Sequence, residues 1–470
     1  MGKTVLLYNP STVFFDLPLA LLAIGTPLES DYNIIIIDAR IEKNIDELLQ
    51  RHIENTLLVG VTSLTGAPLK DAIAFSKKVK ALDDTIPVVW GGWHTSLFPE
   101  QVLKDVPAVD ISVQGQGEES FREIVEAIDN QLSLSEIKGI AYRKKDGSIQ
   151  KTAPRTIQNM NSFERLNYDL IDVEKYFKAK GKRQFDYISS TGCFFRCTFC
   201  ADPFVFNRKF TSLESDRIFE DLKYYHEKYQ FDDVNFQDET FFTYPKNILE
   251  LASKLKSIGT PFTWASTMRA DQGNRMSFED FKLCKEGGLR RLLIGVESGT
   301  QEMMDWLKKD IKLEHVLLCA ERCRELNISV IFPFIVGFPN ETNKSIQGTK
   351  SMVRKLAFMS DGFETPIFYF KPYPGTQITS EAVKNGSYKL PETIQEWSEF
   401  DYIGSKGPWV SNQLFSEMER LKFYLKLNRQ QKVYLSPLRW VAKKRIQKMF
   451  FGLPLEKRIV ELIKPSKELS

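Results

Sequence analysis

Cys193-Phe-Phe-Arg-Cys197-Thr-Phe-Cys200, directly after the strand-like run Asp186-Tyr-Ile-Ser-Ser190, is the segment on which the prediction of the fold depends. The chain has only six cysteines, and three of them stand within these eight residues. Three thiolates on one short loop can hold three irons of a cubane iron–sulfur cluster and leave the fourth iron open to a small molecule. Electron-transfer clusters usually have four cysteine ligands. The loop therefore predicts a cluster that binds a further ligand.

Other interpretations of the three thiols fit the residues less well. A structural zinc site would need a fourth Cys or His ligand, and the candidate His226 lies in a charged, helix-like run with no second CxxC or HxxxH nearby. Six cysteines in 470 residues are too sparse for a disulfide framework. A redox CxxC pair would leave the third thiol without a role. The spacing resembles the CxxxCxxC signature of the radical S-adenosylmethionine superfamily.

This resemblance implies that S-adenosylmethionine is the missing ligand of a 4Fe–4S cluster. In the superfamily the reduced cluster gives one electron to S-adenosylmethionine, and the resulting 5′-deoxyadenosyl radical abstracts a hydrogen atom from the substrate. A reductase, a flavodoxin or a ferredoxin supplies that electron and is an expected partner. Further strand-end motifs resemble the superfamily in the same order over residues 186–376.

Residues at these strand ends are expected to hold S-adenosylmethionine. Gln237-Asp-Glu-Thr240 resembles the acidic motif that contacts the amino group of the methionine moiety, with Glu239 favoured over Asp238, although the same residues could cap a helix. Gly295-Val-Glu-Ser-Gly299 resembles a GxESG element, in which Glu297 would be an unpaired carboxylate at a barrel mouth. The predicted site consists of Phe199, Asp238, Glu239, Ser266, Arg269, Glu297 and Gly337. No catalytic residue is assigned.

The first 130 residues alternate short apolar runs with helical patterns, which is typical of a parallel sheet buried on both faces. They predict a doubly wound, Rossmann-like α/β domain, in which ligands bind beyond the carboxyl ends of the strands. Its expected strands are Val5–Tyr8, Ile34–Asp38, Leu57–Val61, Val88–Trp90 and Ile111–Val113, and its expected helices are Ile45–Ile53, Pro68–Leu82, Pro99–Lys104 and Glu119–Asn130.

The loops at those strand ends resemble those of cobalamin-binding domains. Methionine-synthase-like proteins carry DxHxxG, then SxL, then GG; here Thr62-Ser-Leu64 and Gly91-Gly92 take the second and third places. The histidine of the first motif is missing, because the loop after the first strand reads Asn9-Pro-Ser-Thr-Val-Phe-Phe-Asp16. The resemblance implies cobalamin without a histidine ligand on its lower face; a related fold that has lost the cofactor is the alternative. The predicted cobalamin residues are Thr62, Ser63, Leu64, Gly91, Gly92, His94 and Gly115.

A second βα series starts at Asp186 and is too short for eight units, so a partial (β/α)6 barrel is expected. Its expected strands are Tyr187–Ser190, Val234–Gln237, Phe262–Ser266, Arg291–Val296, Ser329–Val336 and Gly362–Phe370. Helices are expected near 213–229, 245–258, 278–286, 300–325 and 341–358. The predicted organisation is a cobalamin-binding-like domain at 1–136, a connector at 137–182, the radical S-adenosylmethionine barrel at 183–384 and a mainly helical, basic C-terminal region at 385–470.

Composition predicts a soluble, cytoplasmic protein. Hydrophobic residues make up 42% and charged residues 27% of the chain, no apolar run reaches the ~18 residues of a membrane span, and no targeting segment is expected at the start. The formal net charge is +3, yet residues 421–450 hold nine Lys or Arg and no Asp or Glu. This region could be a solvated helix pair or a peripheral contact with an anionic membrane. Nucleic-acid binding is not expected, since no recognition module accompanies it.

Together these features predict a cobalamin-dependent radical S-adenosylmethionine enzyme. The leading function implied by the resemblance is C-methylation of an unactivated carbon in a small-molecule or lipid-like substrate. Two alternatives remain: oxidative cyclisation or ring rearrangement without methyl transfer, and a non-catalytic cobalamin- or redox-sensing module. The three cysteines together with Glu239 and Glu297 favour an enzyme over a sensor. The sequence does not identify the substrate.

Overall fold

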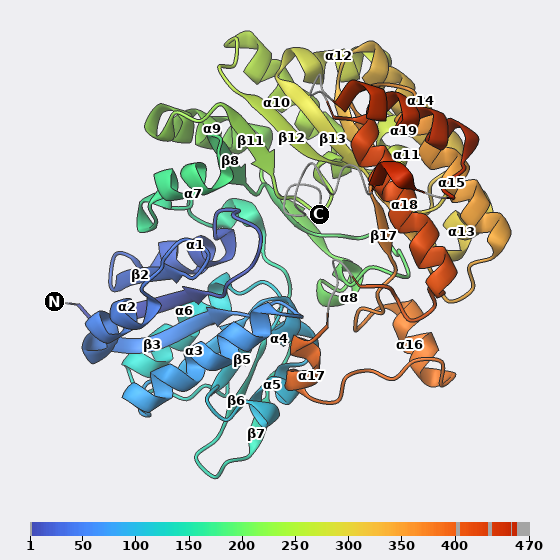
Figure 1. The fold of residues 1–470 in the computed structure, drawn as a ribbon. Helices are drawn as coiled ribbons and strands as arrows, with labels where there is room; N and C mark the ends of the chain where they lie inside the picture. Colours follow the sequence, from blue (N-terminus) through green and yellow to red (C-terminus); the bar gives the residue numbers. More distant parts are fainter. Residues whose placement is uncertain (1, 401–404, 431–434, 453, 458–470) are drawn as a thin grey trace. The chain divides into compact units, whose positions relative to one another are not determined.

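The computed structural model describes residues 2–400, 405–430, 435–452 and 454–457 (Figure 1). The chain divides into two units. Unit 1 comprises Met1–Phe241, Thr260–Trp264 and Tyr373–Tyr402, and unit 2 comprises Phe242–Gly259, Ala265–Pro372 and Ile403–Ser470. The boundaries of these units differ from those of the four ranges expected from the sequence, because unit 1 continues to Phe241 and also takes in Thr260–Trp264 and Tyr373–Tyr402.

The main sheet of unit 1 confirms the doubly wound α/β prediction. Its strand order is β2-β1-β3-β4-β5-β6-β7. The first five of these strands are parallel, and β6 and β7 add an antiparallel hairpin at one edge. The strands are β1 (Thr4–Asn9), β2 (Asn33–Asp38), β3 (Thr56–Thr62), β4 (Val88–Gly91), β5 (Ile111–Val113), β6 (Ile140–Arg143) and β7 (Ile149–Lys151).

Alternate residues of β1 pack into two separate cores, one on each face of this sheet. Leu6 and Tyr8 join the core under α3, whereas Val5 and Leu7 join the core under α1 and α6. Each such buried side chain contributes roughly 1.5–3 kcal/mol to folding. The helices around the sheet are α1 (Leu19–Gly25), α2 (Ile45–His52), α3 (Pro68–Leu82), α4 (Trp93–Leu97), α5 (Pro99–Asp105) and α6 (Glu118–Asp129).

The rest of unit 1 begins the second βα series. Strand β8 pairs parallel with β11, and β9 pairs antiparallel with β10. The predicted continuous strand Tyr187–Ser190 is therefore wrong: β8 ends at Tyr187 and β9 starts at Ser190 in another sheet, because Ser189 and Ser190 bond to Asp238. The elements are α7 (Val173–Lys180), β8 (Gln184–Tyr187), β9 (Ser190–Gly192), α8 (Asp202–Val205), β10 (Phe210–Ser212), α9 (Ser215–Tyr229), β11 (Asp233–Phe236), α16 (Gln377–Lys384) and α17 (Ile394–Ser398).

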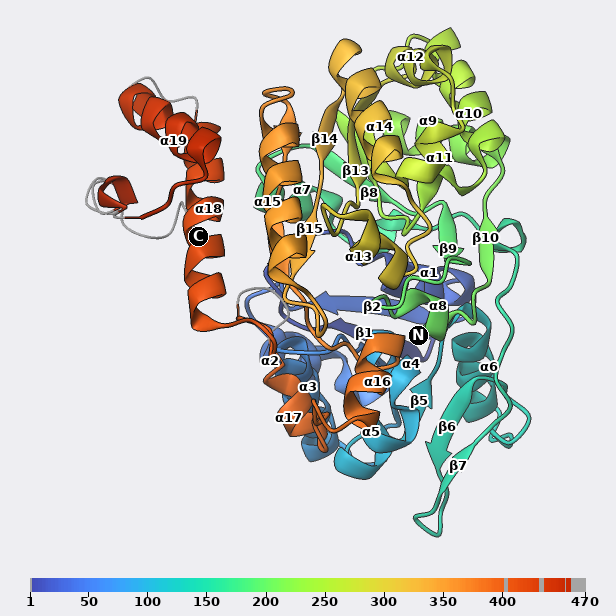
Figure 2. The ribbon, with the colours of Figure 1, turned by 90° about the vertical axis from the view of Figure 1, so that its right-hand side faces the viewer.

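Unit 2 continues the βα series, and β12 (Thr263–Met268) has residues in both units. Strand β14 pairs parallel with β13 and β16, and β15 pairs parallel with β17. Figure 2 shows β13, β14 and β15. Its elements are α10 (Pro245–Ser257), α11 (Ala270–Asn274), α12 (Phe278–Glu286), β13 (Leu289–Ile294), α13 (Gln301–Trp306), α14 (Leu313–Glu325), β14 (Ser329–Ile331), β15 (Phe334–Val336), α15 (Asn343–Ala357), β16 (Phe363–Glu364), β17 (Ile367–Tyr369), α18 (Asn412–Asn428) and α19 (Ser436–Lys448).

Three long elements predicted in this region are each divided in two. The expected strands Ser329–Val336 and Gly362–Phe370 break at Pro333 and Pro366, since proline has no N–H to donate to a strand ladder. The expected helix 300–325 breaks between α13 and α14, where Lys308 and Asp310 adopt positive φ angles.

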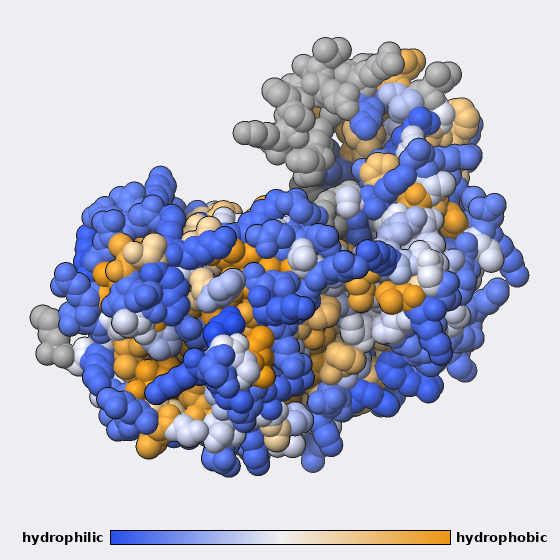
Figure 3. Space-filling view, turned by 90° about the horizontal axis from the view of Figure 1, so that it is seen from below, coloured by the Kyte–Doolittle hydropathy of each residue, from blue (hydrophilic) through white to orange (hydrophobic). Residues whose placement is uncertain are grey.

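The basic region 421–450 is only partly described, because residues 431–434 lie outside the described residues. Helices α18 and α19 cover most of the remainder. Every helix in the described part of the chain is too short or too polar to cross a membrane. On the face shown in Figure 3, hydrophilic residues cover most of the surface and apolar residues form patches between them.

Candidate functional site

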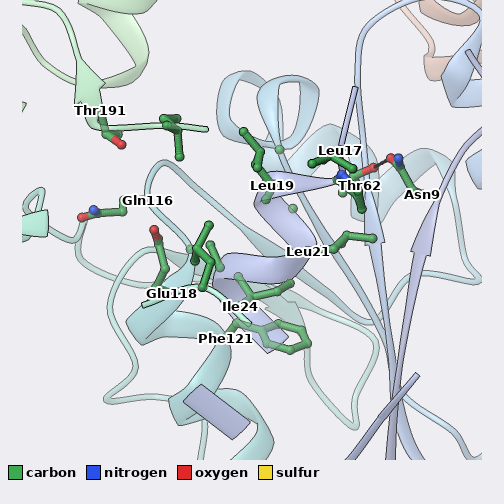
Figure 4. Close-up of a pocket in the computed structure, with 18 of the residues that line it drawn as sticks. Asn9, Leu17, Leu19, Leu21, Ile24, Thr62, Gln116, Glu118, Phe121 and Thr191 are labelled. Carbon is green, nitrogen blue, oxygen red and sulfur yellow. Dashed lines mark hydrogen bonds between the residues drawn. The ribbon is translucent and has the colours of Figure 1, made fainter. Parts of the chain in front are cut away.

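A cavity of about 530 Å³ opens at the carboxyl ends of β1, β3, β4 and β5, and all its lining residues belong to unit 1 (Figure 4). This is where a doubly wound sheet binds ligands. Six of the seven predicted cobalamin residues line it, namely Thr62, Ser63, Leu64, Gly91, Gly92 and Gly115. The structure thus brings together three loops that are separated in the sequence.

Glycines let a ligand approach the backbone of this cavity. Gly92 has a φ of +105°, and a Cβ there would lie 2.8 Å from the carbonyl oxygen of Ser63, so only glycine fits. A Cβ at Gly115 would meet no atom within 4 Å, and one at Gly91 would meet only Val113 at 4.0 Å. These two positions face open space that a Cβ would fill. Gly91, Gly92 and Gly115, here called the glycine cradle, therefore leave room for a large, flat group such as a corrin.

A polar network across the strand ends holds the wall of the cavity. Thr62 donates a 3.0 Å hydrogen bond to Asn9 (Figure 4). Asn9 in turn donates a 3.0 Å bond to Asp38. Arg40 pairs with Asp38 at 2.6 Å and donates to the carbonyl oxygens of Phe14 and Asp16. Burial alone would raise the pKa of Asp38, but the bonds from Arg40 and Asn9 outweigh it and hold that pKa below its ordinary value. The loop after β1 is thereby fixed without a ligand.

Arg40 was not predicted from the sequence. It pairs with Asp38 at the end of β2, and a single Asp and Arg two residues apart form no recognisable motif. Arg40 lines the cavity together with Asp16 and Leu17 of the loop that it holds. The amide of Leu17 donates a 2.8 Å hydrogen bond to Asp186, which pairs in turn with Lys180. The first loop of the sheet is thus tied to the strand that leads into the cysteine loop.

His94 does not line the cavity, although the sequence placed it in the cobalamin site. Its ring is fully buried, lies 3.1 Å from the hydroxyl of Thr65 through Nδ1, and packs against Trp397 and Phe98. Burial lowers the pKa of His94 from 6.5 to about 4, which keeps the ring neutral. The chain's four histidines all lie in its described part, and none lines the cavity.

The three cysteines of the predicted cluster lie together on the loop between β9 and α8. Cys193 is buried, and Cys197 and Cys200 are half-buried. Burial, Asp202 and the neighbouring thiols raise the pKa of Cys200 well above its ordinary value. Among the described residues, no three His, Cys, Asp or Glu side chains converge closely enough to hold a single ion. A loop that presents three thiols to three different irons of a cubane does not need that convergence.

The cysteine loop directly adjoins the cavity within unit 1. Thr191, two residues before Cys193, and Phe206, just after α8, both line the cavity. Phe206 also meets Trp93, with ring centroids 5.9 Å apart. Phe199 stands within the loop and is half-buried. A cluster on this loop and a corrin in the cavity would therefore be neighbours.

The two acidic residues after β11 have different surroundings. Asp238 is engaged by Ser190 and by the amide and hydroxyl of Ser189, which gives it a structural role. Glu239 is half-buried, and its Oε2 atom is inaccessible to solvent and has no hydrogen-bond partner among the described residues. Burial, followed by the charges of Asp202 and Asp238, raises the pKa of Glu239 to about 8. A cationic ligand would satisfy this carboxylate, which fits the preference for Glu239 over Asp238.

The remaining predicted S-adenosylmethionine residues belong to unit 2. Ser266 has a buried hydroxyl without a partner among the described residues. Arg269 bonds to Asp271 at 2.9 Å and to the carbonyl oxygen of Lys309. Gly337 has a φ of +85°, and its amide donates to Glu341. The expectation of an unpaired Glu297 is wrong, because Glu297 forms a buried ion pair with Lys309. Lys309 lies twelve residues later, at a turn that carries no recognisable motif.

Two family models match this chain over the regions that hold these sites. A B12 binding domain matches residues 8–125, and the Radical SAM superfamily matches residues 187–353. Among curated relatives, the uncharacterized methyltransferase PH0819 of Pyrococcus horikoshii is 27% identical over 87% of this chain and 88% of its own length. The cytidylyl-2-hydroxyethylphosphonate methyltransferase of Streptomyces wedmorensis is 24% identical over 72% of this chain and 68% of its own length.

Solved structures show the same fold. The radical S-adenosylmethionine methyltransferase TsrM from Kitasatospora setae, with cobalamin and a 4Fe–4S cluster bound, has a TM-score of 0.71 and 17% identity, covering 83% of this chain and 76% of that chain. The cobalamin-dependent S-adenosylmethionine radical enzyme OxsB, with aqua-cobalamin and S-adenosylmethionine bound, has a TM-score of 0.75 and 16% identity, covering 98% of this chain and 75% of that chain.

Proposed function

We propose that this chain, which belongs to the radical S-adenosylmethionine superfamily and carries a B12-binding domain, transfers a methyl group to an unactivated carbon of a small molecule. The observation that carries the proposal is the adjacency of the two cofactor sites in unit 1. Thr191 and Phe206 flank the cysteine loop and also line the cavity in which the glycine cradle lies. A radical generator and a methyl carrier have to be neighbours if both act on one carbon atom.

The cofactors are a 4Fe–4S cluster, S-adenosylmethionine and cobalamin. When bound, they supply the radical that activates the substrate and the methyl group that the substrate receives. Cys193, Cys197 and Cys200 would hold the cluster. Gly91, Gly92, Gly115 and the Thr62–Leu64 loop would hold the corrin and its tail. We also propose that the residues predicted from the sequence to hold S-adenosylmethionine do so.

The chain's own residues contribute orientation and charge. Glu239 would accept hydrogen bonds from the ammonium group of the methionine moiety, and that contact would return its pKa toward the ordinary range. The Asp38–Arg40 pair holds the loop after β1, so the cavity wall stands before the cofactor arrives. Leu17, Leu19 and Ile24 give this wall an apolar surface that excludes water (Figure 4).

The substrate is proposed as a small molecule and the electron donor as a flavodoxin, a ferredoxin or a reductase. The Kitasatospora setae enzyme has been solved with tryptophan as its substrate, which illustrates the size of ligand that this fold accepts. Peripheral membrane contact through 421–450 stays a prediction. Its support in the described part of that region is Trp440, which is 63% exposed beside Lys443 and Lys444 on α19.

The test is anaerobic reconstitution of the full chain with iron, sulfide and cobalamin, followed by S-adenosylmethionine with a deuterated methyl group and a strong reductant. We expect 5′-deoxyadenosine, and mass spectrometry of metabolite extracts added to the mixture should reveal a product that carries the label. The Cys197→Ala variant should give neither.

Two results would contradict methyl transfer. Formation of 5′-deoxyadenosine with a product that has lost hydrogen and carries no label would favour oxidative cyclisation instead. Absence of 5′-deoxyadenosine from a protein with full iron and cobalamin would favour the sensing module.

A further inference from the structure

We propose that residues 373–400, here called the strap, form a positioning element that mechanically links the cysteine loop to the Gly91-Gly92 loop, so that cobalamin bound at one loop stabilises the cluster at the other. The strap follows the second βα series in sequence but belongs to unit 1. The inference rests on the presence of both cofactors and not on methyl transfer.

One end of the strap supports the cysteine loop. The amide of Ile378, in the first turn of α16, donates a 3.1 Å hydrogen bond to the carbonyl oxygen of Thr198, which stands between Cys197 and Cys200. Thr198 is itself buried. This bond fixes the backbone from which two of the three thiols project.

The turn that precedes α16 packs tightly against the same loop. Gly375 has a φ of +78°, and a Cβ there would lie 2.7 Å from Phe204 of α8 and 3.0 Å from Leu97 of α4. Helix α8 begins two residues after Cys200, and α4 begins directly after Gly92. A single glycine in the strap thus touches the helix after each of the two loops, and an alanine there would be strained by the positive φ and would have to displace the side chains of Phe204 and Leu97.

The other end of the strap supports the Gly91-Gly92 loop through α17. Trp397 is fully buried, and its ring centroid lies 5.8 Å from that of His94 and 5.2 Å from that of Phe98. The amide of His94 donates to the carbonyl oxygen of Ser63 at 3.2 Å. Trp397 therefore packs against His94, the residue whose amide connects the Gly91-Gly92 loop to the Thr62–Leu64 loop.

The strap closes on itself and is anchored along its length. Tyr373 and Phe400, near its two ends, have ring centroids 5.6 Å apart. The amide of Ile394 donates to Asp105 at 2.9 Å, and Gln101 donates to the carbonyl oxygen of Glu392 at 2.6 Å. A segment held in this way transmits a displacement of one loop to the other instead of absorbing it.

Two linked sites stabilise each other reciprocally. If the strap is the link, cobalamin bound against the Gly91-Gly92 loop restrains the cysteine loop and slows the loss of iron from the cluster. A second route must be separated from it, because Trp93 and Phe206 also touch directly. The two routes use different residues, so substitutions can tell them apart.

The experiment measures the rate at which the reconstituted full-length protein releases iron to a ferrous chelator under anaerobic conditions, with and without hydroxocobalamin. For the parent protein we expect release to slow about five-fold with cobalamin, the lower end of coupling between sites. In Trp397→Leu and in Gly375→Ala we expect this ratio to fall to about one, even where both absolute rates rise. The second variant guards against misfolding of the first.

The matched control is Lys70→Gln, which removes an exposed ion pair between α3 and Glu399 of the strap but touches neither loop. It should keep the parent ratio. The proposal is wrong if cobalamin leaves iron release unchanged in the parent protein, or if both strap variants retain the full ratio. It is also wrong if Phe206→Leu abolishes the ratio while the strap variants do not. Because no substrate is added, failure here leaves the methyl-transfer proposal standing.

Discussion

The carboxylate of Glu297 forms an ion pair with the ammonium group of Lys309, and the two side chains are only 9% and 7% exposed. Glu297 adopts a φ of +63°, which is uncommon for a residue with a side chain. Its amide donates to the carbonyl oxygen of Pro333 at 3.0 Å, and its carbonyl oxygen accepts from Ile335 at 2.8 Å. Backbone and side chain together hold this carboxylate in one orientation.

Removing one partner of this pair should be costly. We expect Lys309→Met to lower the free energy of unfolding by about 3–5 kcal/mol, because a buried carboxylate is left without its cation. The double variant Glu297→Gln/Lys309→Met should recover most of that loss. Urea unfolding of the three proteins measures both changes, and equal losses in the single and double variants would contradict a direct ionic role.

The Gly92 backbone should be decisive for cobalamin binding. We expect Gly92→Ala to weaken hydroxocobalamin binding by more than about ten-fold, because φ is +105° and the new Cβ would press on the carbonyl oxygen of Ser63. Gly181→Ala is the matched control, since Gly181 also has a positive φ, of +66°, but ends α7 away from the cavity with no atom within 4 Å of the Cβ position. Absorbance titration with hydroxocobalamin measures the affinity of both variants. An equal loss of affinity in the two would contradict a specific role of the Gly92 backbone.

Replacing a predicted cluster cysteine and replacing a buried core cysteine should have different effects on bound iron. Cys197→Ala should lose the cluster absorbance and nearly all bound iron after reconstitution, since a cubane needs each of the three thiolates. Cys323→Ala removes a fully buried thiol on α14 and should keep its iron while losing some stability. Iron analysis of the two variants side by side checks this assignment, and unchanged iron in the first would refute it.

The buried His94 makes stability depend on pH. Its pKa is about 4 in the folded chain against an ordinary 6.5, so the unfolded chain binds more protons between these values. Stability should therefore fall as the pH drops from 6.5 toward 4, by roughly 3 kcal/mol at most from this group. Urea unfolding at pH 7 and pH 5 should show a smaller difference in His94→Gln than in the parent protein. An identical difference would show that His94 does not titrate in this way.

Local patterns were enough for the five parallel strands of the first sheet but not for β6 and β7, which lie in the range expected to be a connector. The helix Pro68–Leu82 and the strand Ile111–Val113 were predicted with the bounds that the structure has. Strong periodicity and the flanking turns determine such elements, because every residue in them obeys the same local rule. The Gly91-Gly92 loop, which lines the cavity, was also found, since glycine at a strand end leaves a direct trace in the sequence. The Thr62–Leu64 loop has no glycine and was found only through its resemblance to a family motif.

The errors arose where distant residues decided the outcome. The division of β8 from β9 depends on Asp238, which stands about fifty residues later and draws Ser189 and Ser190 away from the strand. The burial of His94 outside the cavity depends on Trp397, some three hundred residues away. Neither partner forms part of a local pattern, so no window of sequence around Ser189 or His94 contains the information.

By itself, the sequence determined a loop of three closely spaced cysteines and predicted a glycine-lined ligand domain, because cysteine spacing and glycine positions are local properties. Only the tertiary structure decided that Thr191 and Phe206 lie in the wall of the unit 1 cavity and that Lys309 pairs with Glu297. It also decided that the strap contacts the cysteine loop and packs against His94, which follows the Gly91-Gly92 pair. These relationships join residues far apart in the chain. They follow from the packing and burial of those residues together, which no local pattern encodes.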